Sequence, residues 1–130
     1  MRVIDETNLT ESINIVILFG SQARGDSSKN SDVDIAMLFK KTCFNKKNIL
    51  DLRSELTAVF TTKIKKDCDI IILNQAPLLL KYQILKYGQN IYISPDFDFN
   101  SYFSLSLKQY FDFKYYQKIH FKGLLERIKR

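Results

Sequence analysis

Two apolar runs of seven residues, separated by a polar segment, constrain this chain more than any other feature. Residues 13–19 (INIVILF) and 33–39 (VDIAMLF) are nearly all apolar, and the first is rich in β-branched side chains. Runs of this kind are typical of strands that are buried on both faces of a sheet. The segment between them, residues 20–32, holds two glycines and several Ser, Asn and Asp residues, which favour turns. The sequence therefore predicts two buried strands joined by a polar loop, with a helical turn at 22–24.

Helices and strands alternate along the rest of the chain. The apolar spacing predicts, in order, a lead-in helix or turn at 5–12, a helix at 47–62, a strand at 68–73, a helix that begins near Pro77 and ends at Gly88, a strand at 89–93 and a long helix from about 100 to 130. Such alternation favours an α/β fold in which helices flank a small mixed sheet. At 130 residues the chain fits one domain. We divide it into a sheet-and-helix core, 1–97, and a C-terminal helical extension, 98–130.

The net charge of +6 is unevenly distributed. Residues 1–39 contain three Lys/Arg and six Asp/Glu, whereas residues 40–130 contain seventeen and eight. Carboxylates gathered in an otherwise basic protein indicate a site for divalent cations. The basic remainder suits an anionic partner, although solvated lysines on exposed helix faces explain most of it equally well.

Asp32 and Asp34 begin the second apolar run. Side chains alternate along a strand, so these two carboxylates project from the same face. Two adjacent carboxylates repel each other unless a cation lies between them, and Mg²⁺ prefers carboxylate, phosphate and water oxygens. The pair therefore predicts a metal site; the alternative is a strand start with two solvated acids.

The polar loop offers groups that suit a nucleoside triphosphate. Gly20 would let a phosphate approach the backbone closely, and Ser21 would either cap a helical turn or donate its hydroxyl to a phosphate oxygen. Arg24 would add a charge-assisted contact, although it fits a solvated loop charge equally well.

A third carboxylate opens the third apolar run. Three carboxylates on two neighbouring strands form the ligand set that two-metal phosphoryl or nucleotidyl transfer needs. Asp67 and Asp69 have the same face parity, so alternation alone does not separate them. We favour Asp69 because it directly precedes the uninterrupted apolar run 70–73.

These residues resemble the signature of the DNA polymerase β-like nucleotidyltransferase superfamily. Gly20 and Ser21 are followed after ten residues by Asp32-Val33-Asp34, and the flanking residues 23–25 and 31 look like those of its minimal nucleotidyltransferase (MNT) group. The strand at 68–73 looks like that group's third-aspartate strand. The resemblance covers about residues 13–93 and implies the polymerase β-like fold.

The resemblance also implies an activity and roles for the residues. The family transfers a nucleoside monophosphate from a triphosphate such as ATP, with two Mg²⁺ (Mn²⁺ is also possible). Asp32 and Asp34 would bind both ions, Asp69 would complete the catalytic metal site, and Gly20 and Ser21 would hold the triphosphate. Ser31, directly before Asp32, is a further candidate nucleotide-binding residue. Many members carry a basic residue where this chain has Gln22, which puts one phosphate contact in doubt.

Minimal members of the group are similar to the antitoxin of HEPN/MNT toxin–antitoxin pairs. By that resemblance the chain would be a protein adenylyltransferase that transfers AMP to a tyrosine of a HEPN-type toxin, with which it would form a hetero-oligomer. One alternative is a non-catalytic antitoxin that neutralises its partner by binding. Another is a nucleotidyltransferase that acts on a small molecule or RNA.

Several features favour a cytoplasmic enzyme that requires neither a membrane nor a nucleic acid. No apolar run reaches the roughly 18 residues of a membrane span, and the start lacks a signal-peptide core. Two cysteines and a single histidine, His120, do not supply a Cys/His zinc set. The C-terminal helix carries more aromatic residues than one packed face needs. We therefore expect some of them to cover a partner.

Overall fold

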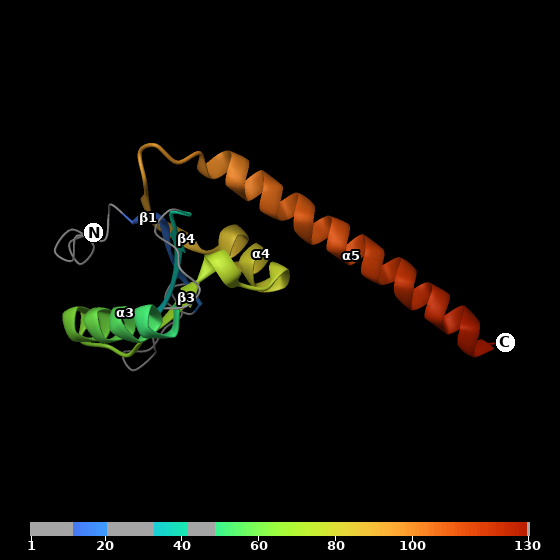
Figure 1. Ribbon diagram of the computed structural model, residues 1–130, viewed down its shortest axis with the longest axis horizontal. Helices are drawn as coiled ribbons and strands as arrows, with labels where there is room; N and C mark the ends of the chain where they lie inside the picture. The colour runs from blue at the N-terminus through green and yellow to red at the C-terminus, as the bar shows by residue number, and fades with distance from the viewer. Residues whose placement is uncertain (1–11, 21–32, 42–48, 130) are drawn as a thin grey trace.

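The computed structural model describes residues 12–20, 33–41 and 49–129. Their elements are β1 (Ile13–Phe19), β2 (Val33–Phe39), α3 (Ile49–Ile64), β3 (Cys68–Ile72), the 3₁₀ turn η3 (Leu73–Gln75), α4 (Leu78–Tyr87), β4 (Gln89–Ile93) and α5 (Phe99–Lys129) (Figure 1). The predicted lead-in before Ser12 and the predicted turn at 22–24 lie outside these residues. The division at residue 97 stays a prediction.

The four described strands form one mixed sheet in the order β3-β2-β1-β4. β1 is antiparallel to both β2 and β4, while β2 and β3 are parallel. Parallel neighbours need a long crossover, which α3 supplies between β2 and β3. The predicted small mixed sheet flanked by helices is therefore confirmed.

Alternation along β2 sorts its side chains between the two faces of the sheet. Val33, Ile35 and Met37 pack in the apolar cluster that includes Leu56 and Phe60 of α3. Ala36 and Leu38 pack in a second cluster with residues of α4 and the first turns of α5. Figure 1 shows α3 on one side of the sheet and α4 on the other. Asp34 has the parity of the second group, so it projects on the α4 side.

The third strand and the helix before it differ slightly from the predicted bounds. α3 continues to Ile64, where Lys65 takes a left-handed φ of 64° and its N–H donates to the Thr61 carbonyl at 2.9 Å. This is a helix-ending geometry that usually falls to glycine, so the sequence offered no stop signal there. β3 ends at Ile72 because Leu73 already belongs to the 3₁₀ turn.

The Asn74 side chain replaces a strand partner for the end of β2, where β3 stops. The last pair of β2 and β3 joins Met37 to Ile72, which leaves the end of β2 without a strand on that side. The Asn74 side chain fills this place, because its Oδ1 accepts from the Phe39 N–H at 2.8 Å and its Nδ2 donates to the Phe39 carbonyl at 2.9 Å. A side-chain amide thus satisfies both backbone groups of one strand residue.

α5 begins with an aspartate cap. Asp98 accepts hydrogen bonds from the hydroxyl and the N–H of Ser101, at 2.6 and 3.1 Å, and these bonds lower the pKa of Asp98. The cap is therefore complete at neutral pH and is lost only as the pH falls through this lowered pKa. None of the described helices has the length and apolar character that a membrane span requires.

We expect Asn74→Ala to lower the free energy of unfolding by about 2–3 kcal/mol, because two partly buried backbone groups lose their partners. Asn74→Asp retains the acceptor for the Phe39 N–H but sets a carboxylate oxygen against the Phe39 carbonyl, so it should not restore the lost stability. Urea unfolding followed by circular dichroism measures both. Equal stability of the wild type and Asn74→Ala would contradict this account of the β2 end.

Candidate functional site

Asp34 and Asp69 are opposite each other on neighbouring strands. The parallel register pairs Asp34 directly with Asp69, each the second residue of its strand. Cys68 and Ile70 pack on the α3 side, so Asp69 projects to the α4 side, as Asp34 does. The two carboxylates therefore share one face at one end of the sheet. The Asp69 side chain is half exposed and thus open to a ligand.

Gly20, which directly follows β1, lies against the Asp34 carboxylate. Phe19 pairs with Asp34, and Gly20, which follows, has a left-handed φ of +76°. A Cβ placed on Gly20 would collide with Oδ2 of Asp34. Only glycine therefore allows the chain to leave β1 in this conformation while the carboxylate keeps its place.

The other predicted residues of the motif, Ser21, Arg24, Ser31 and Asp32, lie outside the described residues. Within the described ranges, no group of three or more Asp, Glu, His or Cys side chains is placed to hold a metal ion. The strand register bears on the choice between the two candidate third carboxylates, because it sets Asp69, and not Asp67, opposite Asp34. The Asp67 carbonyl instead accepts the Val33 N–H at 2.8 Å.

The oxygen donors present here fit a magnesium or manganese ion. Two carboxylates that face the same way on adjacent strands supply hard oxygen ligands, and the remaining positions would be left to phosphate and water. Soft or nitrogen ligands are not part of the pair, which makes it unlike a zinc site. Asp34 and Asp69 are the described residues that would hold such an ion.

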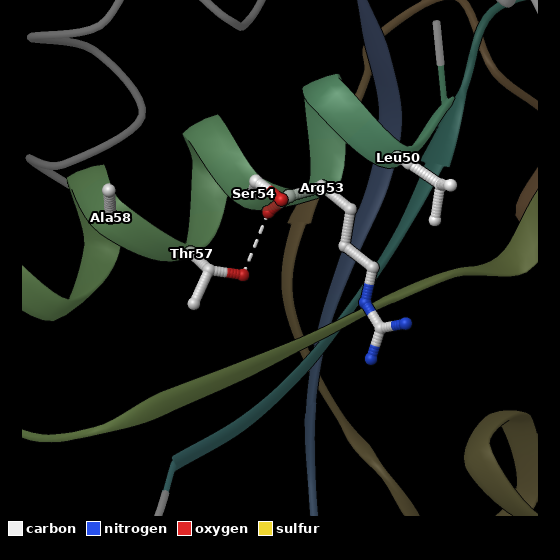
Figure 2. A pocket seen from close by; sticks show the side chains of 5 residues that line it. All are labelled: Leu50, Arg53, Ser54, Thr57 and Ala58. Atoms are coloured by element: carbon white, nitrogen blue, oxygen red, sulfur yellow. Dashed lines mark hydrogen bonds between the residues drawn. The ribbon is translucent and has the colours of Figure 1, made fainter. Parts of the chain in front are cut away.

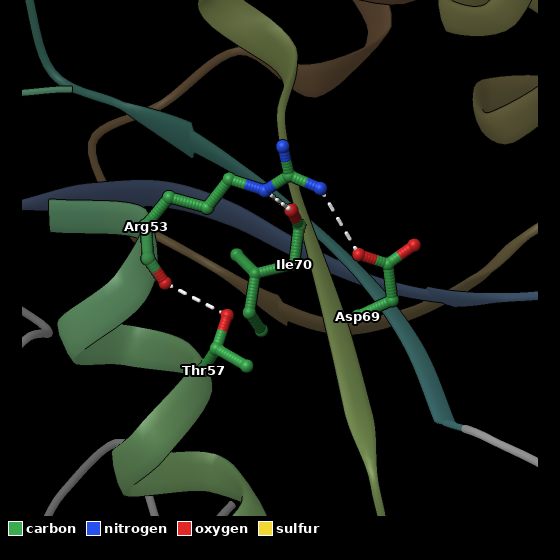
Figure 3. A network of polar contacts seen from close by, with 4 residues as sticks. All are labelled: Arg53, Thr57, Asp69 and Ile70. Atoms are coloured by element: carbon green, nitrogen blue, oxygen red, sulfur yellow. Dashed lines mark hydrogen bonds and ion pairs between the residues drawn. The ribbon is translucent and has the colours of Figure 1, made fainter. Parts of the chain in front are cut away.

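Arg53 of α3 is a site residue that sequence reasoning missed. Its Nε donates to the Ile70 carbonyl at 2.8 Å, and its Nη2 lies 3.1 Å from Oδ1 of Asp69. Figure 3 shows the side chain crossing β3 from the helix to the carboxylate. No motif marks this arginine, since sixteen residues separate it from Asp69 and only the crossover geometry brings the two together.

A shallow pocket of about 430 Å³ lies along α3. Leu50, Arg53, Ser54, Thr57 and Ala58 line it, as Figure 2 shows. Apart from the arginine, these side chains carry no charge, and the Thr57 hydroxyl is already used in a 2.7 Å hydrogen bond to the Arg53 carbonyl. Apart from Arg53, the pocket therefore presents no charged group that could act on or bind a ligand.

A cation and two phenol rings lie at the end of α4. Lys86 donates to the Tyr82 hydroxyl at 3.0 Å, and this bond raises the pKa of Lys86. Its ammonium also lies 5.3 Å from the centroid of the Tyr87 ring. Gly88 joins this helix end to β4, whose first residue, Gln89, pairs with Leu18. Leu18 lies near the end of β1, next to the Gly20 and Asp34 contact. Lys86 therefore remains charged at neutral pH on the side of the sheet that carries the carboxylates.

The distal part of α5 forms a second candidate surface. Its first turns pack on α4, where the Tyr82 and Tyr110 rings lie 4.3 Å apart. From Phe111 to Lys129 every residue is exposed, and in Figure 1 this part of the helix extends away from the sheet. The exposed apolar side chains are Phe111, Phe113, Tyr115, Tyr116, Ile119, Phe121, Leu124, Leu125 and Ile128.

One set of these side chains continues the packed face of the helix. Phe113, Phe121, Leu124 and Ile128 follow Tyr110 at steps that keep them on the same side of an α-helix. We call these four residues the α5 stripe. The face that packs on α4 thus extends as an apolar stripe beyond the end of its neighbour.

Known proteins share both the sequence pattern and the fold. The profile of the family described as "Polymerase beta, Nucleotidyltransferase" matches residues 2–97. A protein adenylyltransferase, MntA, from Shewanella oneidensis is 30% identical over 80 residues, which cover 62% of this chain and 54% of that protein. The chain thus matches about half the length of this curated relative.

Two solved structures show the extent of the shared fold. The crystal structure of a toxin–antitoxin with AMP-PNP contains a chain with a TM-score of 0.74 and 20% identity, covering 96% of this chain and 99% of that one. A tri-AMPylated Shewanella oneidensis HEPN toxin in complex with an MNT antitoxin gives a TM-score of 0.59 and 17% identity over the whole of both chains. The match to three quarters of the sequence, together with this fold, shows that the chain belongs to the polymerase β nucleotidyltransferase family.

Proposed function

We propose that this chain transfers AMP from ATP to a tyrosine hydroxyl of a HEPN-type toxin and so acts as its antitoxin. The observation that carries the proposal is that Asp34 lies opposite Asp69 on the neighbouring strand and against Gly20, the first residue of the family motif. The named activity of the MntA relative supports it, as do the nucleotide analogue and the AMPylated toxin in the two related structures.

The reaction is a displacement at the α-phosphorus. The tyrosine oxygen forms a bond to the α-phosphorus, and the bond from that phosphorus to the α–β bridging oxygen breaks. Pyrophosphate leaves with the electron pair of the broken bond, and the hydroxyl proton is released. Asp34 and Asp69 would hold divalent cations, together with Asp32, and Gly20 would leave room for the triphosphate. When bound, such cations neutralise charge on the phosphates and activate the attacking hydroxyl.

On this proposal the acceptor belongs to another protein, and α5 is the surface that suits it. The α5 stripe has no cover within the described part of the chain. Residues 111–129 carry five Lys/Arg and two Asp/Glu, so a second copy of the same helix would be repelled and an acidic surface attracted. We propose that the toxin packs on this stripe while its tyrosine reaches the carboxylates.

The leading alternative is neutralisation by binding alone. It rests on the same stripe and makes no use of the carboxylates, so removing a carboxylate separates the two functions. Transfer to a small molecule or RNA is the other alternative, and it would leave the α5 stripe without a role.

We expect Asp34→Asn to reduce AMP transfer by at least about a hundredfold, because one metal ligand loses its charge. Asp69→Asn should behave in the same way, whereas Asp67→Asn, the matched control, should retain activity. The measurement is label incorporated from [α-³²P]ATP into the HEPN-type partner. Full transfer by Asp34→Asn would rule out the site, and full neutralisation without transfer would favour the binding alternative.

We expect Gly20→Ala to reduce transfer at least tenfold and to destabilise the fold by about 1–2 kcal/mol, since alanine is strained at this φ and would displace Asp34. Gly123→Ala is the control, because a Cβ on this α5 glycine meets nothing within 4 Å. Thermal unfolding and the same transfer assay measure both variants. Wild-type transfer by Gly20→Ala would contradict the close packing of Gly20 on the carboxylate.

We expect Phe121→Glu to weaken the complex with the HEPN-type partner at least tenfold, because it places a charge in the middle of the α5 stripe. Ile119→Glu introduces the same charge on the opposite side of the helix and should bind almost normally. Calorimetric titration gives both affinities, and circular dichroism checks that the helix persists. Equal affinities for the two variants would exclude the stripe as the docking surface.

A further inference from the structure

We propose that Arg53 is a positioning residue that holds the Asp69 carboxylate of the Asp34/Asp69 pair in the place of a divalent cation while the site is metal-free. The inference rests on the proposed function only in that it takes these carboxylates as metal ligands. Its basis is the path of the arginine, which starts on the α3 side of the sheet and ends on the carboxylate side (Figure 3).

The charge of the pair favours such a residue. Asp34 and Asp69 are register partners on one face, and neighbouring strands lie about 4.8 Å apart. Like charges directly opposite each other on a sheet are destabilising. The Arg53 guanidinium, 3.1 Å from Oδ1 of Asp69, offsets that repulsion without a metal ion.

The backbone holds the guanidinium in place. Arg53 Nε donates to the Ile70 carbonyl at 2.8 Å, and this bond does not depend on the carboxylate. A planar guanidinium fixed through one nitrogen presents its other nitrogens in set directions, which a lysine cannot do. The orientation of the Asp69 carboxylate is therefore fixed by a donor that is anchored to Ile70, the next residue in the chain.

The same contact makes the arginine a competitor of the cation. A cation that binds the pair must share Asp69 with a positive charge already in contact with it, so binding is weaker than the carboxylates alone would give. Removing the guanidinium should therefore have two linked effects: the metal-free protein becomes less stable, and its affinity for the cation increases. A residue that only fastens α3 to β3 would produce the first effect without the second.

The test compares Arg53→Met with the wild type in thermal unfolding, in EDTA and in saturating Mn²⁺, and in Mn²⁺ binding measured by electron paramagnetic resonance. In EDTA we expect the variant to unfold at a Tm lower by about 3 °C. We expect its Kd for Mn²⁺ to fall about threefold, and Mn²⁺ to raise its Tm more than that of the wild type. Equal Kd values, or the same loss of Tm with and without Mn²⁺, would overturn the proposal.

Two further variants serve as controls. Thr57→Ala alters the same face of α3 but leaves both guanidinium contacts, so its response to Mn²⁺ should match the wild type. Asp69→Asn removes the repulsion, so adding Arg53→Met to it should no longer change the Mn²⁺ affinity; a persisting threefold change would also overturn the proposal. These measurements need no transfer. A protein that shows the expected Mn²⁺ responses but transfers no AMP would contradict the proposed function alone.

Discussion

The parallel pairing of β2 with β3 is the interaction on which the site depends. It requires a crossover, and α3 provides that crossover while covering one face of the sheet with Leu56 and Phe60. The same pairing sets Asp34 opposite Asp69, and the packing of α3 brings Arg53 within reach of both the Ile70 carbonyl and the carboxylate. The bonds that stabilise the fold thus also determine the spacing of the charged groups.

The carboxylate pair has an energetic cost that the surroundings offset. Asp34 lies against Gly20 on one side and opposite Asp69 on the other, so the strands that carry the two carboxylates bring them together. A site built on strands holds its ligands more precisely than one built on a mobile loop. The fold therefore tolerates the repulsion between the Asp34 and Asp69 carboxylates while it fixes their relative positions, and such local costs are common at functional sites.

Much of this arrangement followed from the sequence, and the failures have physical causes. The strands and the mixed sheet follow from apolar runs, which are local signals. That Asp34 and Asp69 share a face depends on the register of β2 with β3, which no local signal gives. Arg53 was missed because its contact depends on how a helix crosses a sheet. The end of α3 was missed because Lys65 takes a conformation usually reserved for glycine, and the role of Asn74 depends on where a strand stops. Ser21, Arg24, Ser31 and Asp32 remain predictions.

The free length of α5 has a consequence for how the chain opens. Residues 111–129 are all exposed, so little tertiary packing supports their backbone hydrogen bonds. The sheet is instead protected by two apolar clusters. Amide hydrogens in this part of α5 should therefore exchange without global unfolding, and proteases should cut there first. A partner bound to the α5 stripe would suppress this local opening, so the resistance of the chain to proteolysis depends on whether the partner is bound.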